Sequence, residues 1–127
     1  MRRGYASMPA QNGKGYWRRM LGFGAALALT LATETAVAFM YRAVFRLPWL
    51  LLLWVPLASL LTLPFVWLAF PRLPLPDIWV IALAELFVVV IEACCLYLAP
   101  RQRLRLAHAV ALSLVMNSAS FLLGLLV

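Results

Sequence analysis

The sequence predicts an all-α integral membrane protein, built as an antiparallel bundle of four transmembrane helices. Hydrophobic residues make up 66% of the 127 residues and charged residues only 12%, whereas an average soluble domain is about half apolar and about a quarter charged. Four apolar runs are each long enough to cross a hydrocarbon layer of roughly 30 Å. The connections between them are short, which places neighbouring helices antiparallel. This composition excludes a soluble globular domain and a disordered chain.

Residues 1–20 are expected to form a basic, mostly flexible N-terminal tail that ends in an interfacial anchor. The tail contains three glycines and no acidic residue. Its last part places Trp17 beside Arg18 and Arg19. Tryptophan rings sit at the headgroup level of a membrane and arginines contact lipid phosphates, so these three residues are the predicted anchor.

A cleaved leader is the alternative for this end of the chain. Arg18 and Arg19 precede an apolar run, and residues 36–38 have the A-x-A pattern of a signal-peptide cleavage site. The acid-free, arginine-bearing start would also suit a mitochondrial presequence. The apolar run continues beyond residue 38, however, which favours a transmembrane helix.

Residues 21–127 are expected to form the transmembrane domain. Arg42 and Arg46 mark the far end of the first apolar run, where their side chains can extend to the interface. Pro56 and Pro64 should kink the second helix, because proline removes a backbone hydrogen bond. The expected helices cover residues 21–45, 48–70, 78–98 and 109–127.

A proline-rich connector over residues 71–77 should be stiff and extended. We expect Asp77 at its end to cap the third helix, since aspartate is a preferred N-cap residue. Pro100 ends that helix. The basic turn that follows supplies three further interfacial anchors: Arg101, Arg103 and Arg105.

The charges are sorted by sign along the chain. The eleven bases lie at segment ends, which fits contact with anionic lipid headgroups and does not resemble the aromatic-interleaved basic face of a nucleic-acid-binding protein. With four spans, the five bases of the tail and Arg72 lie on one side of the membrane, and the other five bases lie on the opposite side. The positive-inside rule therefore leaves the orientation open. A re-entrant second run would give eight bases against three, but its 23 residues are long for such a loop.

Three of the four acidic residues, Glu34, Glu85 and Glu92, lie inside apolar runs. An acidic side chain at the centre of a membrane costs about 3 kcal/mol to insert. Each base lies at the end of a segment, so none can neutralise these glutamates at their depth. Each glutamate is therefore either protonated, or it faces a bound cation, water or a partner protein.

Helical spacing predicts that these acids meet other polar groups in the middle of the bundle. Glu85 and Glu92 are seven residues apart and share one helix face, about 10 Å apart along the axis. Asn117 and Ser120 lie on one narrow stripe of the fourth helix. The predicted intramembrane polar cluster consists of Glu34, Ser59, Thr62, Glu85, Glu92, Asn117 and Ser120.

Two interpretations of this cluster stay open. Polar side chains stabilise helix packing in membranes by about 0.6–2 kcal/mol each, but one glutamate would suffice for that role. Three carboxylates with an amide oxygen would also suit a hard cation. Cys94, Cys95 and His108 do not have the spacing of a zinc site, and no metal or cofactor is expected. The chain contains no G-x-S-x-G, H-E-x-x-H or P-loop motif, so we expect no enzymatic activity.

The order of these motifs resembles a group of uncharacterised short bacterial and archaeal four-helix membrane proteins. Members tend to show an Asn-x-x-Thr-x-Pro element, two glutamates seven residues apart and an Asn-x-x-Ser-x-x-x-Gly element. The resemblance covers about residues 30–126, with Ser59 standing where the group has asparagine. It implies the four-helix fold, a prokaryotic cytoplasmic membrane and this residue set, but no activity. The matching residues are Thr62, Pro64, Glu85, Glu92, Asn117, Ser120 and Gly124.

Two functions are compatible with these observations. The first is a non-enzymatic accessory or structural subunit that packs against a larger membrane complex or against itself, because the chain is small and has no soluble domain or catalytic motif. The second is a small proton or cation carrier or channel that uses the intramembrane glutamates. The expected partners are the lipid bilayer, anionic headgroups and other membrane chains, and no nucleic acid.

Overall fold

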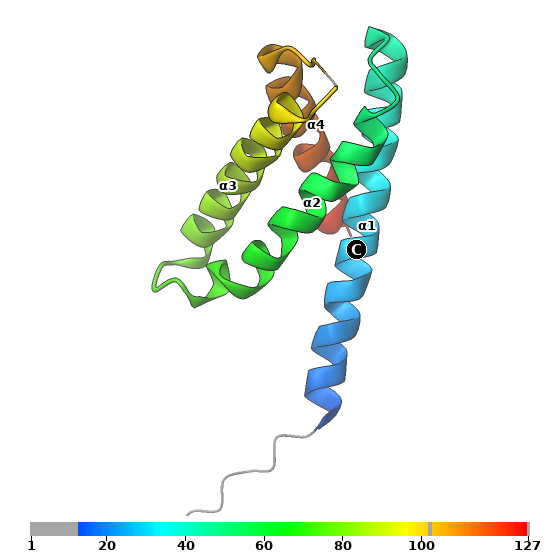
Figure 1. The fold of residues 1–127 in the computed structure, drawn as a ribbon. Helices are drawn as coiled ribbons and strands as arrows, with labels where there is room; N and C mark the ends of the chain where they lie inside the picture. The colour runs from blue at the N-terminus through cyan, green and yellow to red at the C-terminus, as the bar shows by residue number, and fades with distance from the viewer. Residues whose placement is uncertain (1–12, 102, 127) are drawn as a thin grey trace, which may run out of the picture.

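The computed structural model describes residues 13–101 and 103–126, and it shows four α-helices joined by short connectors (Figure 1). All four helices are long and apolar enough to cross a membrane. The chain is an all-α, multi-pass integral membrane protein, as its sequence predicts, and the described residues contain no strand. The elements are α1 (Gly13–Phe45), α2 (Leu51–Leu68), the 3-10 turn η1 (Phe70–Arg72), α3 (Asp77–Leu98) and α4 (Leu106–Gly124).

The helices form a closed ring in which each packs against two neighbours. Contacts run from α1 to α2, α2 to α3, α3 to α4, and α4 back to α1, while the backbones of the diagonal pairs stay apart within the described part of the chain. We call the end with the α2–α3 connector (residues 69–76) the tail end. The opposite end, with connectors 46–50 and 99–105, is the arginine end. The side chains that point inward from all four helices share the space along the central axis.

The first helix begins earlier than the sequence predicts. α1 starts at Gly13, inside the segment expected to be a flexible tail, and it extends past the other helices at the tail end (Figure 1). Residues 13–20 contain no proline, so they can continue the helix that the apolar run begins, because adding a residue to a helix is easier than starting one. Trp17, Arg18 and Arg19 lie in this first part of α1, but their side chains are outside the described set. Residues 1–12 are also outside it.

The second apolar run forms one helix from the arginine end to the tail end. α2 starts at Leu51, because the residues before it form a turn in which the Leu51 N–H donates to the Pro48 carbonyl at 3.2 Å. The helix then continues through Pro56 and Pro64. The alternative of a re-entrant second run is therefore wrong.

The starts of α3 and α4 also differ from expectation. Pro76 occupies the N-cap position of α3, and Asp77 is the first helical residue and makes no side-chain capping bond. The predicted cap is wrong, although a carboxylate in the first turn still interacts favourably with the helix dipole. α4 begins at Leu106, before the expected residue 109, because Arg105 is already an extended N-cap.

The half of the bundle nearest the arginine end is closed by apolar packing. Its core lies where α1 and α3 end and where α2 and α4 begin. The central side chains are fully buried and contribute no charged group. This packing removes the central apolar side chains of the arginine-end half from contact with solvent. The core residues are Ala38, Leu51, Val55, Leu96, Leu104, Ala109, Leu112 and Met116.

Three arginines of the connectors at this end have a left-handed backbone. The φ angles are 53° at Arg46, 64° at Arg101 and 45° at Arg103. Arg46 directly follows α1, and the Leu47 N–H donates back to the Arg42 carbonyl at 3.1 Å. This is the hydrogen bond of a Schellman cap, in which glycine is the usual left-handed residue.

Candidate functional site

A cluster of buried polar side chains lies in the middle of the bundle. Each of its members has at most 6% of its surface exposed. Their side chains come from all four helices, so the cluster exists only when the whole bundle is assembled. The members are Glu34, Ser59, Thr62, Glu92, Ser113 and Asn117.

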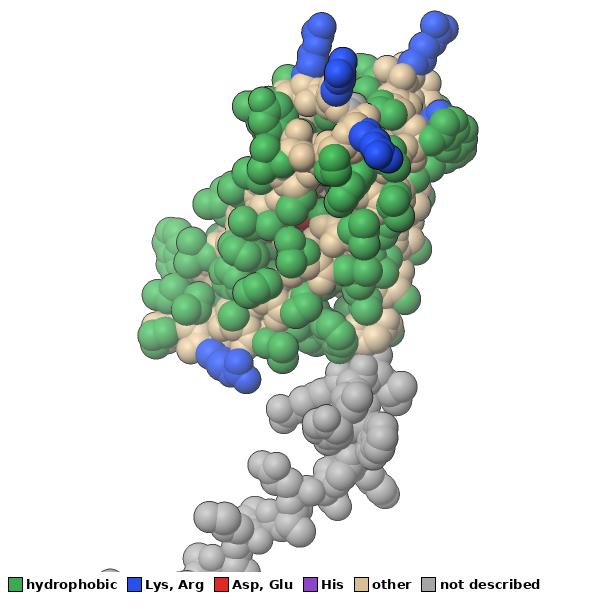
Figure 2. Space-filling model, viewed as in Figure 1, with side chains coloured by type: hydrophobic (Ala, Val, Ile, Leu, Met, Phe, Trp, Pro, Cys, Tyr) green, Lys and Arg blue, Asp and Glu red, His purple; other side chains and the backbone are tan. Residues whose placement is uncertain are grey.

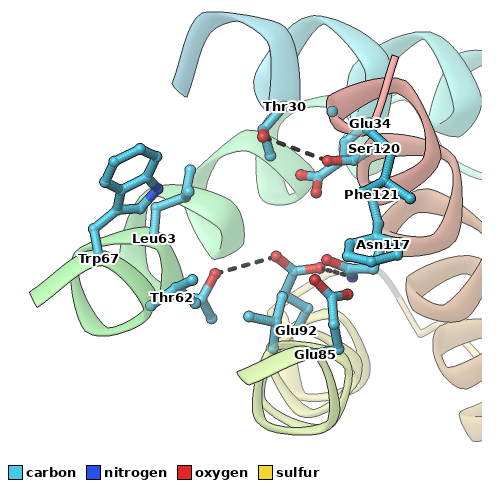
Figure 3. A pocket seen from close by; sticks show the side chains of 14 residues that line it. Thr30, Glu34, Thr62, Leu63, Trp67, Glu85, Glu92, Asn117, Ser120 and Phe121 are labelled. Atoms are coloured by element: carbon cyan, nitrogen blue, oxygen red, sulfur yellow. Dashed lines mark hydrogen bonds between the residues drawn. The ribbon is translucent and has the colours of Figure 1, made fainter. Parts of the chain in front are cut away.

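Glu92 of α3 is held by donors from two other helices. Asn117 Nδ2 on α4 donates to Oε2 at 2.6 Å, and Thr62 Oγ1 on α2 donates to Oε1 at 3.2 Å (Figure 3). Asn117 Nδ2 also donates to the Ser113 carbonyl at 2.9 Å, which fixes the amide. The Ser113 hydroxyl in turn donates to the Val89 carbonyl at 3.0 Å. Both carboxyl oxygens of Glu92 are thus fixed by neighbours whose own positions are set.

Glu34 brings α1 into the same cluster. The Ser59 hydroxyl on α2 lies in hydrogen-bond contact with Oε2 of Glu34 and with the Val55 carbonyl. Glu34 is 1% exposed, yet it lines the central cavity. No side chain of the described residues donates to its second oxygen, Oε1. This carboxyl therefore keeps an acceptor free for a small ligand.

The two other predicted cluster residues lie nearer the tail end. Glu85 is half-buried and lines the same cavity, and it makes no hydrogen bond to the described residues. The Ser120 hydroxyl on α4 contacts Thr30 Oγ1 on α1 at 3.4 Å. Of the seven residues predicted for the cluster, all but Ser59 line the cavity, and Ser59 binds a residue that does.

The cavity has a volume of about 310 Å³ and extends from the buried cluster to the tail end. Its inner lining residues Glu34 and Glu92 are 1% exposed, whereas its outer lining residues Trp67 and Leu125 are exposed. The cavity therefore opens at the tail end. The lining is formed by Thr30, Glu34, Thr62, Leu63, Val66, Trp67, Glu85, Val88, Glu92, Asn117, Ser120, Phe121, Gly124 and Leu125.

The aromatic walls of the cavity were missed by sequence reasoning. Trp67 and Phe121 both line it (Figure 3). Phe121 lies four residues after Asn117, so helix periodicity would have placed it on the same face. Trp67 lies four residues after Leu63, but no sequence feature marked Leu63 as inward-facing. Phe23 of α1 packs against Trp67 edge-to-face, with ring centroids 5.4 Å apart, and fixes its position.

The described arginines are all remote from the cluster. They gather at the arginine end, and Arg72 lies at the tail end (Figure 2). Arg101, Arg103 and Arg105 are exposed at the arginine end, where a membrane anchor is expected to lie. None of the described cationic side chains therefore lies at the depth of the three glutamates, as the sequence predicts.

Histidine, cysteine and carboxyl side chains do not gather into a three-ligand metal site among the described residues. Cys94 and Cys95 are free thiols on α3. His108 is at the start of α4, where its Nδ1 lies 3.0 Å from the Tyr41 hydroxyl.

The sequence matches no protein-family model, no curated protein and no solved structure.

Proposed function

We propose that this protein binds a proton or a small monovalent cation at Glu34 and Glu92 and carries it across the membrane. The supporting observation is the cavity that leads from the tail end to these two buried carboxyl groups. Its volume of about 310 Å³ is at the lower end of ligand pockets, which hold about 300–1,000 Å³. Water or a hydrated ion could therefore enter, while a large substrate could not.

The chemistry of the cluster favours a site that is repeatedly loaded and emptied. Two ionised carboxylates in one apolar bundle repel each other, and no base lies beside them. A proton or a cation removes this repulsion. Asn117 and Thr62 hold Glu92 by hydrogen bonds, and these donors stabilise the ionised form when the ligand leaves.

The closed half of the bundle favours a carrier over an open channel. Between the cluster and the arginine end lies the apolar core that contains Leu96 and Leu112, both 0% exposed. A continuous ion path would need polar groups or water there. Release to the arginine end therefore requires this core to separate while the tail-end opening closes.

The test is ion flux into proteoliposomes that contain the purified protein and a pH-sensitive or cation-sensitive dye. With an imposed membrane potential, the unmodified protein should give flux above that of empty vesicles. Glu92→Gln and Glu34→Gln should reduce flux to the empty-vesicle rate. Asp77→Asn is the matched control, because it also removes one carboxylate from α3 but lies at the helix start, outside the cavity. Wild-type flux equal to that of empty vesicles, or full flux in Glu92→Gln, would refute the proposal.

A second candidate is an accessory subunit that self-associates or joins a larger membrane complex through α3 and α4. Glu85 and the exposed Ser118 line a groove of about 220 Å³ on the outer face between these helices. A half-buried carboxyl at membrane depth is costly against lipid, and a partner helix could donate hydrogen bonds to it. Light scattering and native mass spectrometry in mild detergent test this. A monomer that retains no partner chain, and is unaffected by Glu85→Gln, would contradict it.

A further inference from the structure

A second hollow lies on the outer face of the bundle, between α2 and α3, and is separate from the polar cavity. Its volume is about 410 Å³ and its wall is almost entirely apolar. It shares no lining residue with the central cavity. Because it lies on the outer surface of two membrane-spanning helices, it faces the hydrocarbon of the bilayer. It is lined by Trp54, Leu57, Ala58, Leu61, Ile91, Cys94, Cys95, Leu98, Ala99 and Pro100.

This outer groove runs along the membrane normal within one leaflet. On α2 its lining extends from Trp54 to Leu61, and on α3 from Ile91 to Leu98. Each stretch of eight residues rises about 10 Å along a helix, because its ends are seven residue steps apart. One leaflet contributes about 15 Å of hydrocarbon, half of the bilayer's total. The groove thus has the length of the upper part of one acyl chain and ends at the headgroup level, at Pro100.

The chain beyond Pro100 is strongly basic. Arg101 follows directly, Arg103 and Arg105 lie in the same connector, and Arg46 is in the other connector of this end. Figure 2 shows Lys and Arg side chains gathered here. None of the described acidic residues lies at this end, since Asp77 starts α3 at the tail end and the glutamates are within the bundle.

We propose that the outer groove and these arginines together bind one anionic phospholipid. One acyl chain lies in the groove between α2 and α3, and the headgroup phosphate is bound by Arg101 with Arg103. The combination decides the ligand class, because an apolar slot that ends at unpaired guanidinium groups complements a molecule with an apolar chain and an anionic head. A zwitterionic lipid is bound less well, because its ammonium group meets arginines without a neighbouring carboxylate.

The proposal separates this site from general attraction to the membrane surface. Simple surface attraction would depend on the number of bases and not on their position. A built site depends on both the groove and the arginines beside it. The experiment therefore compares loss of the arginines at the site with loss of an arginine at the opposite end. It also compares a bulky residue in the groove with one elsewhere on α3.

The experiment is native mass spectrometry of the full chain in mild detergent with phosphatidylglycerol or phosphatidylcholine of identical acyl chains. The unmodified protein should retain one phosphatidylglycerol in preference to phosphatidylcholine, and rising salt should weaken that retention. Arg101→Gln with Arg103→Gln should weaken it by about fivefold per arginine. Arg72→Gln at the tail end should leave it unchanged.

The groove is tested with Cys94→Trp, which places a large ring in the hollow from an exposed position. It should reduce retention of both lipids, while Ala82→Trp, at an exposed site of α3 outside the groove, should not. Equal retention of the two lipids, loss in Arg72→Gln equal to that in the double variant, or normal retention in Cys94→Trp would overturn the proposal. Complete competition by glycerol phosphate, which has no acyl chain, would also overturn it, because the groove would then play no part. Retention of a second protein chain instead of a lipid would also overturn the proposal.

Discussion

Asn117 on α4 donates to Glu92 on α3 over 2.6 Å, a shorter contact than the 3.0 Å bond from the Ser113 hydroxyl to the Val89 carbonyl between the same helices. The amide nitrogen is shared with the Ser113 carbonyl, so the side chain has a fixed orientation. The pair thus has two roles. It joins neighbouring helices, and it keeps a carboxyl oxygen at the inner end of the cavity.

Replacing Asn117 by alanine should destabilise the bundle. The variant leaves Glu92 with one donor fewer, and an interhelical hydrogen bond in a membrane contributes about 1–2 kcal/mol. We expect the free energy of unfolding in mixed detergent micelles to fall by that amount. Ser118→Ala, at the exposed neighbouring position, should change it by less than about 0.5 kcal/mol. Equal effects of the two variants would contradict this role.

Truncation of the apolar core should cost more than truncation on the lipid face. Leu112 is 0% exposed and Leu114 is 48% exposed on the same helix. Leu112→Ala leaves a void in a closed core, for which we expect a loss of about 2–4 kcal/mol. At Leu114 lipid fills the space, and the loss should be below about 1 kcal/mol. Reversible unfolding measured by circular dichroism distinguishes the two. Comparable losses would show that the arginine-end half is not closely packed.

Arg46→Gly should stabilise the protein. Arg46 has a φ of 53°, and a left-handed backbone costs a residue with a Cβ atom about 1 kcal/mol that glycine avoids. Arg46→Ala is the control, since it removes the same charge but keeps the Cβ atom. The thermal midpoint should rise in the glycine variant only. A rise in both variants would attribute the effect to charge.

Cysteine accessibility should follow the one-sided opening of the cavity. In a background with Cys94→Ser and Cys95→Ser, Gly124→Cys at the outer lining should react with a polar thiol reagent added on the tail side. A Cβ atom at Gly124 meets no atom within 4 Å, so the variant should fold normally. Ala109→Cys, in the apolar core, should remain unmodified from either side. Reaction at residue 109 would indicate a continuous water path.

The four helices were predictable because each apolar run is long and the connections are short. Helix ends were less predictable. Asp77 was expected to cap α3 because of its residue type, but the preceding Pro76 already has the extended backbone of an N-cap. α1 extends back to Gly13 because nothing in that segment stops a helix that the apolar run has begun.

Glu85 and Ser120 lie outside the buried cluster and Ser113 belongs to it without having been predicted. The other members were predictable, since an acidic residue in an apolar run needs polar partners. The pairing was not. That Thr62 and Asn117 bind Glu92 while Ser59 binds Glu34 depends on the rotation and relative height of each helix. Periodicity gives the face of a helix but neither of these quantities. The end at which the cavity opens could not be predicted from the sequence either, because it depends on which half of the bundle packs closely.

The half-closed shape of the bundle has an electrical consequence. Where water fills the cavity, the tail-side potential extends to the buried carboxyl groups, and the transmembrane voltage falls mainly across the apolar core beyond them. A full crossing of 100 mV changes the energy of one elementary charge by about 2.3 kcal/mol. Loading of Glu92 from the tail side would then depend little on voltage, and transfer through the core towards the arginine end would sense nearly all of it.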